Sequence, residues 1–242
     1  MTARKKPRCR WEGGWPAVLL GLAALPGWGA APPAPPGQLP AAQQKRLDQL
    51  GQELTQAAHA GTMGEALRLA REVEALRRRW QGARHWQTID AGYAIERWGR
   101  LARLSEADQR EAARALRREA EADGLTARHR YAEAEKAYRD VLAIHQKLLG
   151  EGHPDTAQSY GNLASSLHAQ GKHREAQPLY QKALDLRQKL LGEGHPATAQ
   201  SYNNLASNLD AQGKHREAQP LLQKALDPVS YTHLTLPTKR IV

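Results

Sequence analysis

The pattern of apolar positions from residue 43 to residue 227 is that of successive helices. Tyr160, Leu163, Ala164 and Leu167 stand at i, i+3, i+4 and i+7, which places them on one stripe of a helix with 3.6 residues per turn. Strong helix formers dominate this part of the chain, and β-branched residues are sparse. The pattern therefore predicts an all-α fold.

A pair of such helices recurs at a fixed period of 42 residues. Residues 187–228 differ from residues 145–186 at only seven positions, so the unit has been duplicated. In each copy a glycine, Gly171 or Gly213, stands where the first helix is expected to end and the second to follow. A fixed period of this length predicts an α-solenoid of antiparallel helix pairs.

The pattern continues upstream in a weaker form. Residues 129–149 align with the second helix of the unit, and the stretch from Ser105 to Asp123 is its expected partner, capped by Ser105. Residues 43–60 are expected to form the first helix of a divergent unit, and residues 82–86 resemble an exit loop. The second helix of the divergent unit lies 68 residues before the equivalent helix at 129–149, whereas the period of the clear units is 42. The longer spacing predicts an inserted helix.

The units resemble the tetratricopeptide repeat family, in the 42-residue variant typical of kinesin light chains and many bacterial repeat proteins. The signature positions of the first clear unit hold Tyr160, Leu163, Ala164, Leu167, Gly171, Ala176, Tyr180 and Ala183. The second copy matches them except that Leu222 replaces the second tyrosine. The resemblance implies a right-handed superhelix that binds other proteins and does not catalyse a reaction.

The resemblance also implies a peptide-binding surface, because the first helices of the family line the inner, concave face of the superhelix. The inward positions, with two asparagines beside them, are Gln158, Gly161, Asn162, Ser165, His168, Gln200, Asn203, Asn204, Ser207 and Asp210. Most of these side chains are polar and able to hydrogen-bond an extended peptide. A merely solvated helix face is the alternative interpretation. The Lys and Asn clamp with which some relatives hold a terminal carboxylate is not recognisable.

The formal net charge of +10 does not indicate a nucleic-acid partner. Residues 1–31 and 228–242 carry much of the excess, and charges alternate in sign along the helical part, as on a solvated helix face. Arg77 to Arg79 form the strongest basic tract, and a basic helix end beside the C-terminal dipole explains it equally well. We expect no nucleic-acid binding.

Residues that could catalyse a reaction or hold a cofactor form no recognisable pattern. His153 and His195 occupy equivalent loops, so duplication accounts for the histidine count, and no two histidines stand at i,i+4 on one helix. The single cysteine, Cys9, allows no internal disulfide. The sequence therefore predicts no enzyme, no metal site and no cofactor.

Residues 1–31 have the order of a secretory signal peptide. A basic start precedes the apolar run from Ala17 to Leu25, which is too short to cross a bilayer as a helix, and small residues follow. We expect a protein exported to the periplasm or outside the cell, without stable membrane insertion unless the leader stays uncleaved as an anchor. Residues 32–42 are rich in proline and predict a stiff linker.

The remaining divisions follow from the repeat. We expect a divergent helical region at 43–104, a degenerate repeat at 105–154 and two near-identical repeats at 155–227. The pattern stops after Asp227, and the helix is expected to stop with it. Residues 228–242 match no part of the unit and resemble translated adapter or assembly-junction sequence. We expect this tail not to be native and the array to be truncated.

Three functions stay open at this point. The first is a non-catalytic scaffold that binds a peptide or protein ligand on the concave face. The second is the scaffold part of a larger protein that carries an effector, because some relatives are fused to caspase-like protease domains. The third is a self-associating structural array, because a missing final unit leaves the last helix exposed.

Overall fold

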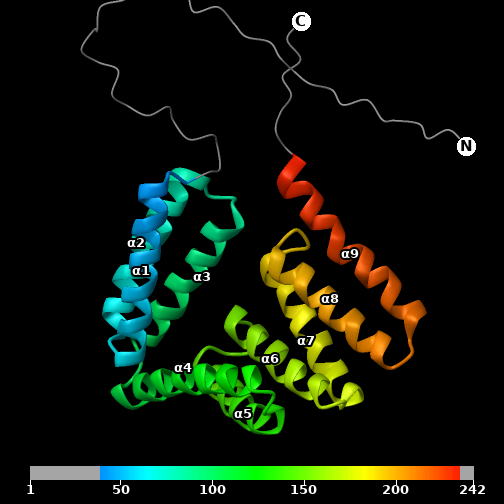
Figure 1. The fold of residues 1–242 in the computed structure, drawn as a ribbon. Helices are drawn as coiled ribbons and strands as arrows, with labels where there is room; N and C mark the ends of the chain where they lie inside the picture. The colour runs from blue at the N-terminus through cyan, green and yellow to red at the C-terminus, as the bar shows by residue number, and fades with distance from the viewer. Residues whose placement is uncertain (1–38, 235–242) are drawn as a thin grey trace, which may run out of the picture. The chain divides into compact units, whose positions relative to one another are not determined.

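The described part of the chain is built of helices, which confirms the all-α prediction. The structure, a computed structural model, describes the backbone of residues 39–234 and the side chains of residues 39–226. Its helices are α1 (Ala41–Ala60), α2 (Met63–Gln81), α3 (Trp86–Leu101), α4 (Glu106–Ala127), α5 (Tyr131–Leu148), α6 (Pro154–Ala169), α7 (His173–Leu191), α8 (Pro196–Ala211) and α9 (His215–Leu234) (Figure 1). The predicted leader at 1–31 and residues 32–38 of the predicted linker lie outside the described residues. The linker prediction was wrong for residues 41 and 42, which belong to α1.

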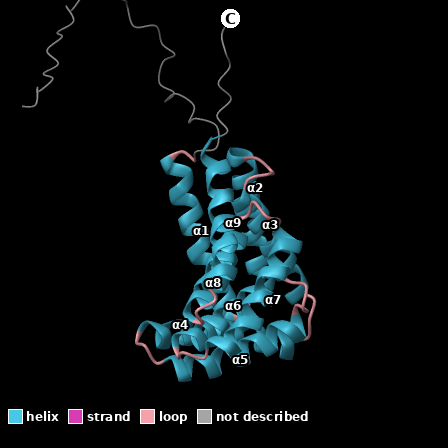
Figure 2. Ribbon diagram, turned by 90° about the vertical axis from the view of Figure 1, so that its right-hand side faces the viewer, coloured by secondary structure: helices cyan, strands magenta, loops and turns pink. Residues whose placement is uncertain are grey.

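Successive helices pack against one another as antiparallel pairs. The pairs α4 with α5, α6 with α7, and α8 with α9 make the most extensive contacts, and α5 with α6 and α7 with α8 join one pair to the next. Figure 2 shows that short loops connect these helices. The sequential packing confirms the predicted solenoid of helix pairs.

Apolar side chains gather in two clusters within the described residues. The first cluster contains residues of the successive helices α4 to α9. It includes the predicted stripe on α6, whose residues, among them Tyr160 and Leu167, are buried. Ala164 and Ala206 are fully buried in this cluster, because neighbouring helices approach closely only where side chains are short. The second cluster joins α1 to α4 with the end of α5 and is centred on large side chains such as Trp98.

Three prolines lie inside the described helices without ending them. The α7 helix is continuous through Pro178, and α9 is continuous through Pro220. The α9 helix continues past Pro228 to Leu234, so the expectation that the helix stops with the repeat pattern was wrong for the backbone. A proline removes its own hydrogen bond and can bend a helix without terminating it.

The extra helix that the 68-residue spacing predicts is α3. It pairs with α2 and makes few contacts with α4, which packs against α1 instead. On its other side, Tyr93 Oη donates to the carbonyl oxygen of Leu190 at 2.6 Å, and Arg100 donates to that of Leu149 at 2.7 Å. The α3 helix therefore contacts the C-terminal ends of α5 and α7, where the exit loops of two successive repeats begin.

Two further contacts strengthen this connection. Arg97 pairs with Asp155 at 2.7 Å at the start of α6, and Asp90 Oδ1 lies 3.1 Å from Nε2 of His195 before α8. The Trp86 ring also meets the His195 ring edge-on. In a simple solenoid each repeat touches only its neighbours, so α3 departs from that scheme.

Candidate functional site

The two helices that carry the predicted inner positions begin in the same way. His153 and His195 cap α6 and α8, and Nδ1 of each ring accepts a hydrogen bond from a backbone N–H at 3.1 Å. A proline occupies the first helical position in both, where its missing N–H costs nothing. His85 caps α3 in the same manner, so the loop at 82–86 does resemble the repeat loop. These histidines have a structural role.

On α6 the predicted positions, here called the α6 row, are Gln158, Gly161, Asn162, Ser165 and His168. Nε2 of Gln158 donates to Asn162 at 2.7 Å, and Asn162 in turn donates to Glu119 of α4 at 3.2 Å. Gly161 is buried as a residue, yet a side chain built there would meet no atom within 4 Å. Each side chain of the α6 row that can form a hydrogen bond already has a partner within the chain.

Ser165 and His168 show how the α6 row is occupied. Tyr180 Oη donates to Ser165 Oγ at 3.0 Å, and Ser165 donates to the carbonyl oxygen of Gly161 at 2.9 Å. Nδ1 of His168 lies 3.1 Å from Oδ1 of Asn208 on α8 and 3.3 Å from Nδ1 of His173. The α6 row and α8 are therefore joined directly at one point.

The equivalent positions on α8, here called the α8 row, are more available. They are Gln200, Asn203, Asn204, Ser207 and Asp210; Asn204 is half-buried and the other four are exposed. Gln200 donates to Asn204 at 2.7 Å, and Asp210 pairs with His215 at 2.9 Å. Asn203 and Ser207 have no hydrogen-bond partner among the described residues.

A single difference between the repeats explains why Ser207 is free. Tyr138 donates to Asp123 at 2.6 Å and Tyr180 donates to Ser165, which is the same contact in two successive units. In the third unit Leu222 stands at the tyrosine position and has no hydroxyl group. Ser207, the counterpart of Ser165, thus keeps its hydrogen-bonding capacity for another molecule.

Sequence reasoning missed two charged residues beside the α6 row. Burial raises the pKa of Glu119, and the neighbouring carboxylates Asp123 and Asp155 raise it further. Arg187 of α7 is buried, donates to Ser201 at 2.8 Å and also donates to Gln158. The 42-residue spacing relates Glu119 to Gly161, so extending the alignment into the degenerate unit would have placed it beside the row.

A groove at the turns between paired helices is separate from both rows. It has a volume of about 700 Å³ and lies between the α6–α7 and α8–α9 turns. Its lining residues include Lys172, Gln177 and Lys214, and no residue of either row lines it. The prediction from the family pattern did not include this place.

Residues 39–234 show neither a cluster of metal-ligating side chains nor a membrane-spanning helix. No group of three or more histidine, cysteine, aspartate or glutamate side chains in the described part is placed to bind a metal ion. His168 and His173 face one another as a pair only. Among the described helices, none combines the length and the apolar character that crossing a bilayer requires.

The chain is similar to known proteins both in its sequence and in its fold. Residues 111–189 and 159–227 match the family model described as tetratricopeptide repeat. The crystal structure of the putative kinesin light chain nearly identical TPR-like repeats of Podosopora anserina is 22% identical in sequence. The match covers 78% of this chain and 98% of that one, with a TM-score of 0.44. BtubC (BKLC) from P. vanneervenii is 18% identical, covers 84% of this chain and 97% of its own, and has a TM-score of 0.50.

At these identities the likeness to the solved structures concerns the fold alone. No curated protein matches the chain. The family match coincides with α4 to α9, whose helix pairs, small buried alanines and glycine turns are those of the predicted repeat. Residues 111–227 are therefore tetratricopeptide repeats.

Proposed function

We propose that this protein is a non-catalytic scaffold that binds an extended peptide segment of a partner protein, chiefly along the α8 row. Tetratricopeptide repeats typically mediate protein–protein interactions, which supports a binding role. The observation that carries the proposal is the contrast between the two rows. Asn203 and Ser207 are exposed without a partner among the described residues, whereas their counterparts in the α6 row are Gly161, which has no polar side chain, and Ser165, which is hydrogen-bonded within the chain.

An unpaired amide and an unpaired hydroxyl four residues apart suit a peptide backbone. Asn203 can donate and accept at once, and Ser207 follows it one turn later on the same face of α8. A peptide lying across this face would exchange bonds to water for bonds to protein, without first breaking contacts inside the chain. Gln200 and Asp210 extend the polar face at its two ends.

The test is selection of peptides from a random display library on the immobilised full chain, followed by affinity measurement with variants. Asn203→Ala together with Ser207→Ala should weaken selected peptides about tenfold, since removing well-placed interface contacts costs about 1–2 kcal/mol. Gln181→Ala together with Asp185→Ala is the matched control, because these exposed side chains of α7 bond only to each other, at 2.7 Å.

Two outcomes would count against the proposal. One is that no peptide is enriched above background on the full chain. The other is that selected peptides bind the α8 variant and the α7 control equally well, which would place their contacts on another face.

A further inference from the structure

The groove between the two turns, here called the turn groove, is polar and carries several cations. Its lining residues are Gly171, Lys172, His173, Arg174, Glu175, Gln177, Ala211, Gln212 and Lys214. Three of them are permanently cationic and one is acidic. Within the described residues no carboxylate lies within 4 Å of the charged groups of Arg174 or Lys214.

The preceding unit shows what this position looks like when it is closed. Glu135, the counterpart of Gln177 one period earlier, is buried and receives Lys172 at 2.9 Å, Gln170 at 2.9 Å and Arg139 at 2.6 Å. Burial alone would raise the pKa of Glu135, but the bonds from Lys172 and Gln170 hold it below its ordinary value. The site around this turn therefore stabilises a carboxylate.

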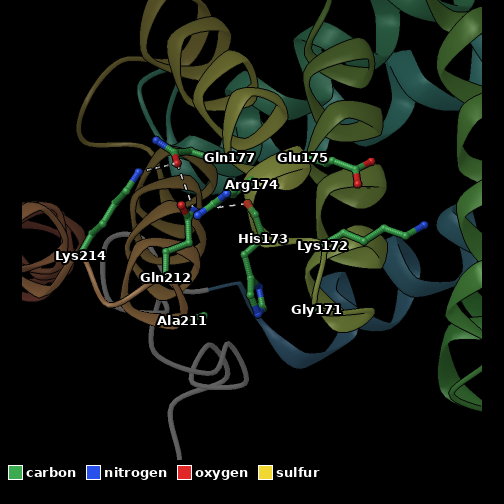
Figure 3. A pocket seen from close by; sticks show the side chains of 9 residues that line it. All are labelled: Gly171, Lys172, His173, Arg174, Glu175, Gln177, Ala211, Gln212 and Lys214. Carbon is green, nitrogen blue, oxygen red and sulfur yellow. Dashed lines mark hydrogen bonds between the residues drawn. The ribbon is translucent and has the colours of Figure 1, made fainter.

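The turn groove has the same donors and lacks that carboxylate. Lys214 and Gln212 correspond to Lys172 and Gln170, and each lies 3.1 Å from Oε1 of Gln177, a neutral amide. Figure 3 shows Lys214 and Gln212 reaching toward Gln177, while the side chains of Lys172 and Glu175 extend away from them. The charge of Lys214 is thus left without a counter-charge beside an open groove.

We propose that the turn groove is a second binding site, which accepts a glutamate or aspartate side chain from an acidic segment of a partner protein. The carboxylate of that segment supplies near Lys214 the negative charge that Glu135 supplies beside Lys172 and that the neutral amide of Gln177 lacks. Arg174 lines the same groove and adds donors, and carboxylates accept several such bonds at once. The volume of about 700 Å³ accommodates a few side chains of a peptide.

The experiment titrates the isotopically labelled full chain with a blocked peptide that has two adjacent glutamates between Gly and Ser, and with the same peptide carrying glutamines. Both ends are capped, so only side-chain carboxylates differ. We expect saturable changes in the backbone amide signals of Gly171 and Gln212 with the acidic peptide only. Omitting added phosphate keeps a competing anion out of the buffer, and a separate titration with inorganic phosphate tests whether any anion suffices.

The repeat supplies the decisive variants. Gln177→Glu restores the closed arrangement of the preceding unit and should weaken the acidic peptide about tenfold, because Lys214 then has an internal partner. Gln181→Glu adds the same charge one turn further along α7 at an exposed position and should leave the affinity nearly unchanged. Glu135→Gln removes the internal carboxylate beside Lys172 and should therefore raise the number of acidic peptides that one chain binds.

Three results of the peptide titrations would overturn the proposal: no saturable binding, equal weakening by Gln177→Glu and Gln181→Glu, or equal affinity for the glutamine peptide. Equal weakening would mean that the acidic peptide senses only the overall positive charge. Binding to inorganic phosphate as tight as to the acidic peptide would likewise remove the peptide from the assignment. The double variant at Asn203 and Ser207 leaves the turn groove intact, so the failure of either site is distinguishable from failure of the other.

Discussion

At the scale of single residues, the histidines of the loops connect helix initiation to pH. Burial lowers the pKa of His153 and of His145, and the guanidinium of Arg97 lowers both further. A neutral His153 is also what the cap of α6 requires, since Nδ1 must accept the N–H of Asp155. Protonation on this nitrogen would remove the cap.

Stability should therefore fall as the solution becomes acidic. Below the ordinary histidine pKa of about 6.5, the unfolded chain binds protons that the folded chain resists, so the free energy of unfolding decreases as pH falls. The contribution of His153 is fully present above that pH. His153→Asn keeps a capping oxygen and removes the titration, so its urea-derived stability should fall less steeply between pH 7 and pH 5. An unchanged slope would show that His153 does not titrate in this way.

The ten predicted inner positions illustrate what a repeat can and cannot reveal about residues. The period fixes which side chains share a face, because copies at a spacing of 42 residues have the same place in the helix. It does not reveal which of them are already bonded. Ser165 and Ser207 are the same residue in equivalent places, and only the partner on the following helix, Tyr180 or Leu222, distinguishes them.

At the scale of helices, two glycines with opposite surroundings make a matched pair. Gly171 has φ of +77° in the turn that ends α6, a conformation that side chains disfavour. Gly161 lies inside α6, and a Cβ there meets nothing within 4 Å. We expect Gly171→Ala to lower the free energy of unfolding by about 1 kcal/mol and Gly161→Ala to raise it by about 0.5–1 kcal/mol.

Urea unfolding of the two variants beside the parent chain measures both effects. Changes in the same direction would contradict the assignment of one glycine to a turn and the other to a helix interior. The pair also serves the binding experiments, because Gly161→Ala alters the α6 row by one methyl group while leaving the fold more stable.

The existence of the helices was predictable, and the position of α3 was not. Helix pairs follow from the 3.6-residue stripes and from the 42-residue period, and the 68-residue spacing predicted an inserted helix. The contacts of that helix join Arg97 to Asp155 and Tyr93 to Leu190, residues separated by 58 and 97 positions. Among the described residues these pairings do not recur at the 42-residue period, so no periodic pattern in the sequence predicts them.

At the scale of the whole described part, α3 should make distant repeats unfold together. Tyr93→Phe, combined with Arg97→Met and Asp155→Ala, removes two of its bonds to the repeat loops; alanine is the residue already present at the equivalent position 197. In the parent chain, urea transitions followed by tryptophan fluorescence and by helical circular dichroism should coincide. In the variant they should separate, because the tryptophans of the described residues, Trp80, Trp86 and Trp98, all lie in α2 and α3.

Tyr131→Phe is the control for the loss of a tyrosine hydroxyl. Tyr131 bonds to His129 two residues away, at 2.7 Å, so this change affects a local contact only. Its two transitions should still coincide. Coinciding transitions in the α3 variant as well would show that the neighbour contacts between repeats are sufficient to hold the unit together.

The length of α3 also limits where the array can gain units by duplication. With 16 residues it spans roughly 24 Å, and it already reaches the loops before α6 and α8. A further 42-residue unit inserted between those loops would move them apart and leave one end of α3 without its contacts. A unit added after α9 would disturb none of the contacts of α3. The same helix that links the repeats therefore directs growth of the array to the side of α9.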